Sequence, residues 1–304
     1  MSKSTTVLIT GIGLGMAKAY LSRPNHIVIC SVRSAKTDVT DLEAASKASG
    51  SKLLLVYIES TSKTDPAKAV EDVQAAGVDH LDVLIANAGG MPEGNKPLLE
   101  LGPDELCWSV QVNAAAPLLV LQAFKPLLQK ADAPRFAVIS STSGSIEHMK
   151  NIHSFIFPGY GAAKATLNWL TMGVHLSQEW LTTLVIHPGL VQSEPGNWVA
   201  KQIGMAEAPT TIEQAAEGVI KALTNATPVN FLLATECMQE NILGIKRSRR
   251  QTKLQMCCPL KKGLAQWFSL PNYHMVLISE QYKGLPNLGR LVKIAMINGG
   301  SDWL

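Results

Sequence analysis

The chain has 304 residues, of which 46% are apolar and 17% are charged, so it can form a sizeable hydrophobic core and is not disordered throughout. The formal net charge is only +3, which gives no support to nucleic-acid binding. The five cysteines are odd in number and lack C-x-x-C spacing, so we expect reduced thiols, no disulfide framework and no metal site.

The N-terminal residues 1–5 lack an apolar leader region, so we expect no signal peptide. No run approaches the roughly 18 apolar residues of a membrane helix. We therefore expect a cytoplasmic protein without a membrane partner.

Short aliphatic and β-branched runs alternate with longer helical segments. The runs that predict strands are 6–10, 27–31, 53–58, 83–86, 136–140, 184–187 and 231–233. Segments that predict helices include 41–48, 66–76, 103–128 and 162–176. Apolar strands separated by helices are typical of a parallel sheet covered on both faces. The pattern predicts an α/β fold: a Rossmann-type doubly wound parallel sheet, as a single domain with an atypical C-terminal tail.

Residues 236–304 follow a different pattern. A basic cluster at 246–250 is followed by Cys257-Cys258-Pro259, and no periodicity extends the sheet. We therefore predict a domain at 1–235 and an irregular basic tail at 236–304. The tail is either a loosely ordered appendage or sequence never selected to fold. A solvated charge run explains the basic cluster better than an anionic membrane or nucleic-acid partner does.

Four polar or turn-forming residues fall where predicted strands end. They are Thr10, Asn87, Ser141 and Pro188. Ligands of open parallel sheets bind outside the carboxyl ends of the strands. This edge of the sheet is therefore the expected site.

Tyr160 and Lys164 lie four residues apart, on one face of a predicted helix. A nearby ammonium stabilises phenolate, so we expect the pKa of Tyr160 to fall below its usual value of about 10. A phenol so tuned can act as a general acid. Ser141 can hydrogen-bond a substrate oxygen, and Asn113 can hold a water or bend its helix. A lone Tyr-x-x-x-Lys is common by chance, whereas the combination indicates proton transfer.

With these motifs the chain resembles the short-chain dehydrogenase/reductase family over residues 5–235. Matches to the family are Asn87-Ala88-Gly89 after an apolar run, the tetrad Asn113, Ser141, Tyr160 and Lys164, Pro188-Gly189 after the sixth strand, and Ser193. Within the family it is most similar to fungal norsolorinic acid ketoreductase-like enzymes, a likeness carried by residues 59–62 and 85–89.

The resemblance implies an enzyme that reduces a small-molecule carbonyl substrate. It also implies a homo-oligomer and a role in fungal secondary metabolism. It implies that Tyr160 donates the proton, Lys164 lowers the Tyr160 pKa and binds the nicotinamide ribose, Ser141 orients the carbonyl, and Asn113 anchors a relay water. The implied cofactor-binding residues are Gly11, Ile12, Gly13, Ser31, Arg33, Lys36, Glu59, Asn87, Ala88, Gly89, Tyr160, Lys164, Pro188, Val191 and Ser193.

The residues after the second strand favour NADP. An NAD enzyme usually has an acidic residue here, which binds the ribose 2′-hydroxyl. Residues 31–36 contain no acid, and Arg33 and Lys36 could meet a 2′-phosphate. The alternative is that both are solvated surface cations.

The glycine loop departs from the family pattern Thr-Gly-x-x-x-Gly-x-Gly. Thr10-Gly11-Ile12-Gly13-Leu14-Gly15 is about four residues short, although amides of this loop normally cradle the pyrophosphate. The competing hypothesis is therefore a catalytically silent dinucleotide-fold protein that serves as a binding or scaffold module.

Overall fold

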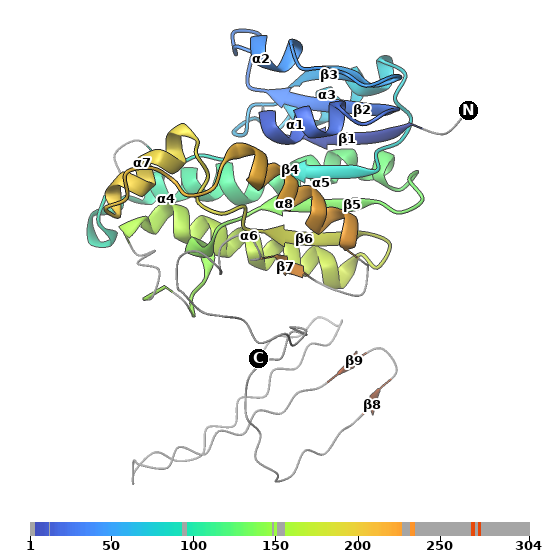
Figure 1. The fold of residues 1–304 in the computed structure, drawn as a ribbon. Helices are drawn as coiled ribbons and strands as arrows, with labels where there is room; N and C mark the ends of the chain where they lie inside the picture. The colour runs from blue at the N-terminus through green and yellow to red at the C-terminus, as the bar shows by residue number, and fades with distance from the viewer. Residues whose placement is uncertain are drawn as a thin grey trace, which may run out of the picture. The chain divides into compact units, whose positions relative to one another are not determined.

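The computed structural model describes most of the first three quarters of the chain and three short strands beyond it (Figure 1). The described residues are 4–11, 13–92, 96–147, 149–150, 156–226, 232–234, 269–270 and 273–274. The chain forms two compact units, Met1–Lys246 and Arg247–Leu304. In the second unit, the described residues are the antiparallel pair β8 (Ser269–Leu270) and β9 (Tyr273–His274).

The first unit is built on a seven-stranded parallel sheet. Its strands are β1 (Thr5–Ile9), β2 (His26–Val32), β3 (Lys52–Tyr57), β4 (Val83–Ala86), β5 (Arg135–Ile139), β6 (Thr182–Ile186) and β7 (Leu232–Ala234). They are ordered β3-β2-β1-β4-β5-β6-β7, and every neighbouring pair is parallel. The chain leaves β1 in one direction and returns beside it in the other, so β1 and β4 flank the switch point where such folds bind ligands. The predicted Rossmann-type doubly wound sheet is confirmed.

Helices cover both faces of the sheet. They are α1 (Leu14–Leu21), α2 (Thr40–Glu43), α3 (Asp65–Ala75), α4 (Pro103–Val110), α5 (Ala116–Leu128), α6 (Pro158–Ser177), α7 (Glu194–Gln202) and α8 (Ile212–Asn225). One core cluster joins the sheet to α1, α2 and α8, and the other joins it to α3, α5 and α6. The strands serve both clusters because successive side chains point to opposite faces.

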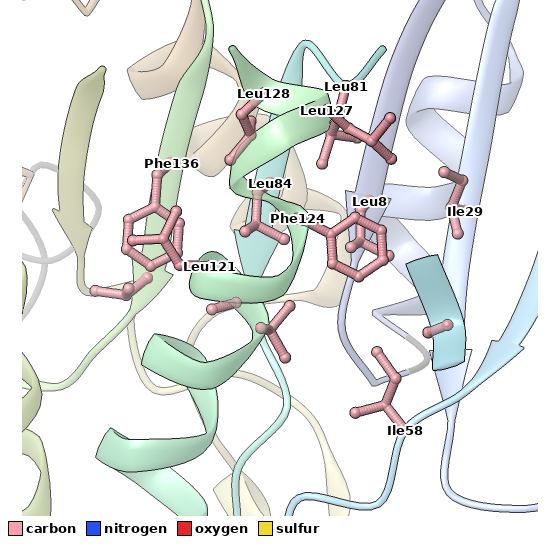
Figure 2. Close-up of a cluster of buried hydrophobic side chains, with 14 of the residues drawn as sticks. Leu8, Ile29, Ile58, Leu81, Leu84, Leu121, Phe124, Leu127, Leu128 and Phe136 are labelled. Atoms are coloured by element: carbon pink, nitrogen blue, oxygen red, sulfur yellow. The ribbon is translucent and has the colours of Figure 1, made fainter. Parts of the chain in front are cut away.

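The second cluster shows this alternation directly. Leu8, Leu84 and Phe136 come from three neighbouring strands, and Leu121 and Phe124 from α5 pack over them (Figure 2). The residues on either side of Leu8 and Leu84 in the sequence belong to the opposite cluster. Both faces are therefore apolar, which explains the near-continuous apolar runs in the sequence.

The predicted helix over 103–128 is interrupted. A π-helical turn, η2 (Gln111–Ala115), separates α4 from α5. The stretch Pro103–Leu128 has 26 residues and contains an 18-residue window with a mean hydropathy of 1.3, so by length and composition alone it could cross a membrane. Phe124, Leu127 and Leu128 are fully buried in the second core cluster, so its apolar face packs against this sheet.

The helix predicted over 41–48 is shorter in the structure. It ends at Glu43, and the following residues turn back toward the first unit's α1. The Ala48 amide donates to the Leu21 carbonyl over 2.9 Å, a tertiary bond that a continuing helix would not allow. Tertiary contact here overrides local helix propensity.

Candidate active site

Tyr160 and Lys164 lie on α6, one turn apart. Lys164 is buried, and its Nζ donates to the Ile139 carbonyl at the end of β5 over 2.8 Å. The same nitrogen lies 5.4 Å from the centroid of the Tyr160 ring. The structure therefore brings the predicted pair together at the carboxyl edge of the sheet.

Burial dominates the titration of both groups. It raises the pKa of Tyr160 to about 12, opposed by a hydrogen bond with Ser141. It lowers the pKa of Lys164 to about 8, so this amine still carries its proton at neutral pH. The expected lowering of the Tyr160 pKa by Lys164 is therefore wrong for the chain by itself. The cost of charging a buried phenol exceeds the help that it receives from its neighbours.

Ser141 follows β5 and begins a 3₁₀ turn, η3 (Thr142–Gly144). Its Oγ accepts from the Ser143 amide over 3.1 Å and is also hydrogen-bonded to Tyr160. The turn sits directly on α6 because it contains Gly144. A Cβ at Gly144 would lie 2.7 Å from the Lys164 carbonyl carbon, closer than real Cβ atoms approach. Only glycine allows this contact, which holds Ser141 near Tyr160.

Asn113 lies in the π-helical turn and is fully buried. Its Oδ1 accepts from the Gly90 amide over 3.1 Å, and its Nδ2 donates to the carbonyls of Gly90 and Ser109 over 2.8 and 3.0 Å. The widened turn lets the side chain bond a carbonyl of its own helix, and such turns are frequent at functional sites.

Gly89 connects this turn with the lysine. A Cβ at Gly89 would lie 2.7 Å from Asn113 Oδ1 and 3.7 Å from Lys164 Nζ. The absence of a side chain leaves the space between these two polar groups open. The Asn-Ala-Gly segment, Asn113 and Lys164 therefore meet at one place.

Asn87 joins the ends of the two central strands. Its amide and that of Ala88 both donate to Thr10 Oγ1 over 3.0 Å, and its Nδ2 donates to the Thr10 carbonyl over 3.1 Å. These bonds fix β4 against β1 at the switch point. Asn87 thus supports the edge of the sheet, and Ala88 faces a pocket.

That pocket lies at the carboxyl ends of β1 to β4. Its lining residues are Thr10, Ser31, Ile58, Glu59, Ser60, Ser62, Pro66, Ala88, Ala116, Pro117, Leu119 and Val120. The Glu59 amide donates to Asp65 Oδ2 over 3.0 Å, which ties the end of β3 to the start of α3. Three predicted cofactor residues, Ser31, Glu59 and Ala88, therefore share one pocket.

Arg33 and Lys36 follow β2 and are exposed. Within the described part of the chain, neither forms an ion pair. Both cations are free to meet an anion at the end of β2.

The glycine loop is very short. Gly11 and Gly13 have φ of 70° and 47°, left-handed values that favour glycine, and Gly13 caps α1 directly. The Gly11 amide donates to Ser31 Oγ over 3.0 Å. Ile12, the remaining predicted residue of this loop, lies outside the described residues. One of the loop amides that could face a phosphate is therefore already engaged by a side chain.

The segment after β6 carries the last predicted residues, Pro188, Val191 and Ser193. Val191 forms an isolated parallel bridge with Thr210. Ser193 caps α7: its Oγ accepts from the Gly196 amide over 3.2 Å. The Ser193 hydroxyl thus has a structural partner, and the structure does not place it against Tyr160 or Lys164.

An aromatic pair joins α7 to the start of α6. The rings of Phe157 and Trp198 lie 5.9 Å apart, tilted by 57°, with Phe157 buried and Trp198 42% exposed. Phe155, two positions before Phe157 in the sequence, lies outside the described residues. Phe157 is the N-cap residue of α6 and stands three residues before Tyr160.

Sequence reasoning did not identify Gly144, Gly90 or Ser109 as parts of this site. Their roles depend on close backbone approach or on a carbonyl released by the π-helical turn, and neither has a sequence signature. Among the described residues, no three His, Cys, Asp or Glu side chains cluster as metal ligands would.

A doubly wound parallel sheet with a serine, a tyrosine and a lysine at its carboxyl edge defines a dinucleotide-fold oxidoreductase. The chain belongs to the short chain dehydrogenase family, whose model matches residues 5–203. Members of this family are oxidoreductases that bind a nicotinamide dinucleotide. The resemblance stated from the motifs is confirmed.

Two fungal relatives illustrate the match. The short-chain dehydrogenase RED3 of Pyricularia oryzae is 98% identical over 231 residues, which are 75% of this chain and 92% of that protein. A norsolorinic acid ketoreductase of Emericella nidulans is 34% identical over 243 residues, 77% of this chain and 92% of that protein.

Solved structures show the same fold. An NADPH-bound carbonyl reductase from chicken fatty liver has a TM-score of 0.63 and 24% identity, covering 75% of this chain and 94% of that chain. A carbonyl reductase from Pseudomonas aeruginosa has a TM-score of 0.60 and 26% identity, with the same coverage.

Proposed function

We propose that the chain is an NADP-dependent ketoreductase that reduces a small-molecule ketone. The observation that carries the proposal is the hydrogen bond between Ser141 and Tyr160 beside the buried amine of Lys164. The ketoreductases among its relatives support the same reaction class.

Each polar group has a definite task in this reaction. Tyr160, whose pKa is about 12, keeps its proton until a carbonyl oxygen beside it gains negative charge, and then donates that proton. Ser141 donates a hydrogen bond to the same oxygen. The Lys164 ammonium favours the phenolate left after proton transfer. Asn113 lies where it can anchor the water through which Tyr160 recovers its proton.

The residues present fit a dinucleotide at both of its ends. The pocket along β1 to β4 lies at the switch point, where the adenosine end would bind, and the space that a side chain at Gly89 would fill lies beside Lys164 Nζ, which suits a ribose hydroxyl. When bound, NADPH supplies the hydride. Arg33 and Lys36 would hold its 2′-phosphate, which favours NADP over NAD.

A specific observation favours a second candidate, the silent binding or scaffold module. The Gly11 amide is bonded to Ser31, and only residues 10–13 separate β1 from α1. A fluorescence titration with NADPH separates the two candidates. Micromolar binding supports the ketoreductase, and no binding at millimolar cofactor supports the silent module.

Turnover gives the direct test of the proton donor. Tyr160→Phe should keep the fold and NADPH affinity but lose about 10²–10⁴ in kcat. A variant that reduces ketones at the wild-type rate would remove Tyr160 from the mechanism.

The substrate we propose is an apolar or aromatic ketone of fungal secondary metabolism. The proposal is supported by the Phe157–Trp198 contact and by the norsolorinic acid ketoreductases among the relatives. A panel of matched aryl and alkyl ketones tests it through kcat/KM, and a preference for short alkyl ketones would contradict it. The cytoplasmic location and a homo-oligomer remain predictions.

A further inference from the structure

Three consecutive residues at the end of β5 are each bonded to a different turn of α6. The partners on α6 are spaced by four residues, so they share one face of the helix. The contacts are Ile139 O with Lys164 Nζ at 2.8 Å, Ser140 Oγ with Asn168 Oδ1 at 2.6 Å, and Ser141 with Tyr160. Two of these contacts include the proposed catalytic groups. The middle one, Ser140 with Asn168, has no part in the mechanism above.

The Ser140–Asn168 bond is short, and its Ser140 end is buried. Ser140 is 4% exposed, and its amide continues the sheet by donating to the Ile186 carbonyl over 2.7 Å. Its hydroxyl donates to Asn168 at the short end of the range for O–H···O bonds. An unpaired hydroxyl at this depth would be unfavourable, so the bond persists whenever the strand and the helix are packed.

Side-chain length makes this bond more restrictive than its neighbour. Lys164 reaches the strand through a long side chain with many rotamers, so its bond tolerates small shifts of the helix. Serine and asparagine have short side chains, so a bond between them fixes the separation of β5 and α6 closely. That separation decides whether the next residue, Ser141, reaches Tyr160.

We propose that Ser140 and Asn168 form a positioning pair, which sets the distance between Ser141 and Tyr160 and keeps Lys164 on the Ile139 carbonyl. The catalytic consequence rests on the ketoreductase function proposed above. The effect on the position of Lys164 does not rest on that function, because the pair contacts the same strand and helix whether or not the chain reduces a ketone.

The first test is kinetic and uses Ser140→Ala, Asn168→Ala and the double variant. Each single change should lower kcat about tenfold while the KM of the ketone and the Kd of NADPH stay within about twofold, since the substitution lies outside both binding surfaces. The double variant should be no slower than either single one, because the bond can be lost only once. Ser140→Thr keeps the hydroxyl and should restore the rate.

Thr171→Ala is the matched control. Thr171 is also buried on α6, and its Oγ1 donates to the Leu167 carbonyl over 2.8 Å, within the helix. Its removal should lower Tm as Ser140→Ala does but leave kcat unchanged. If Ser140→Ala and Asn168→Ala lower Tm and leave kcat within twofold of wild type, the pair is merely structural and the proposal is overturned.

The second test does not need activity. The rate of Lys164 acetylation, followed by mass spectrometry against pH, gives the midpoint at which this amine loses its proton. The wild-type midpoint should lie near 8, and in Ser140→Ala and Asn168→Ala it should rise by about one unit as water reaches the loosened contact. An unchanged midpoint in both variants overturns the proposal even if the wild type reduces no ketone. Loss of the ketone reduction alone would overturn only the proposed function.

Discussion

Gly144→Ala tests whether the contact between η3 and α6 aligns the site. The new Cβ would lie 2.7, 2.8 and 2.9 Å from three backbone atoms of α6, the carbonyl carbon of Lys164, the nitrogen of Ala165 and the oxygen of Lys164. Backbone atoms cannot rotate away, so the turn must retreat by about 0.7 Å or more to reach ordinary contact distance. Ser141 begins this turn and would move with it.

The expected losses follow from that displacement. Overpacking of this kind costs about 1–3 kcal/mol of unfolding free energy. A misplacement approaching 1 Å can cost up to about 10² in rate, so kcat should fall by roughly 10–10²-fold. Thermal unfolding and steady-state ketone reduction measure the two effects.

Gly173→Ala is the control on the same helix. A Cβ there meets nothing within 4 Å, so the change should only favour the helix, by about 0.5–1 kcal/mol, and leave kcat unchanged. If Gly144→Ala keeps both the wild-type Tm and the wild-type kcat, the contact does not align the site and the reasoning fails.

Four further predictions concern charge, cofactor and chain. Because burial lowers the pKa of Lys164 to about 8, the unfolded chain binds more protons than the folded chain from about pH 8 to pH 10. The unfolding free energy of the wild type, measured in urea titrations relative to that of Lys164→Met, should therefore rise across this pH window. A difference between the two proteins that does not change with pH would refute this prediction. Arg33→Asp should weaken NADPH far more than NADH in binding titrations, whereas equal effects would make Arg33 a surface cation. Insertion of Ala-Asn-Arg-Gly between Gly11 and Ile12 should tighten NADPH binding at least tenfold, about 1.4 kcal/mol, and weaker binding would show that the short loop works as it stands. Deletion of everything after Ala234, where the last strand of the parallel sheet ends, should leave the circular dichroism largely unchanged, and aggregation of the truncated chain would show that the deleted residues stabilise the sheet.

The sheet could be predicted from the sequence because both of its faces are covered. A parallel strand buried on both sides must be apolar throughout, as in 83–86, where the predicted and observed bounds agree. Helix ends were less predictable. The segment 41–48 has helical composition, yet the helix ends at Glu43, and the Ala48 amide bonds the Leu21 carbonyl instead of continuing the helix.

The site could be located from the sequence but its energetics could not. The strand-end position predicted that Ser141 lies at the carboxyl edge of the sheet, and the four-residue spacing predicted that Tyr160 and Lys164 share one helix face. The family resemblance joined the three residues in one predicted site. The predicted direction of the Tyr160 pKa shift was wrong, because the spacing of residues in the sequence shows which charges are near a group but not how deeply that group is buried. Burial depends on segments distant in the chain, here the contact of Gly144 with α6.

The effect of the short glycine loop on cofactor binding depends on both its length and its hydrogen bonds. Its length is visible in the sequence, but the consequence depends on where the Gly11 amide points. In the structure that amide donates to Ser31 Oγ, a side chain of the neighbouring strand that also lines the pocket at the carboxyl ends of β1 to β4. A phosphate at this position would have to displace Ser31 or use other amides at the start of α1. We therefore expect the Ser31 hydroxyl and a cofactor phosphate to compete for the Gly11 amide, and we expect the proposed four-residue insertion to relieve that competition.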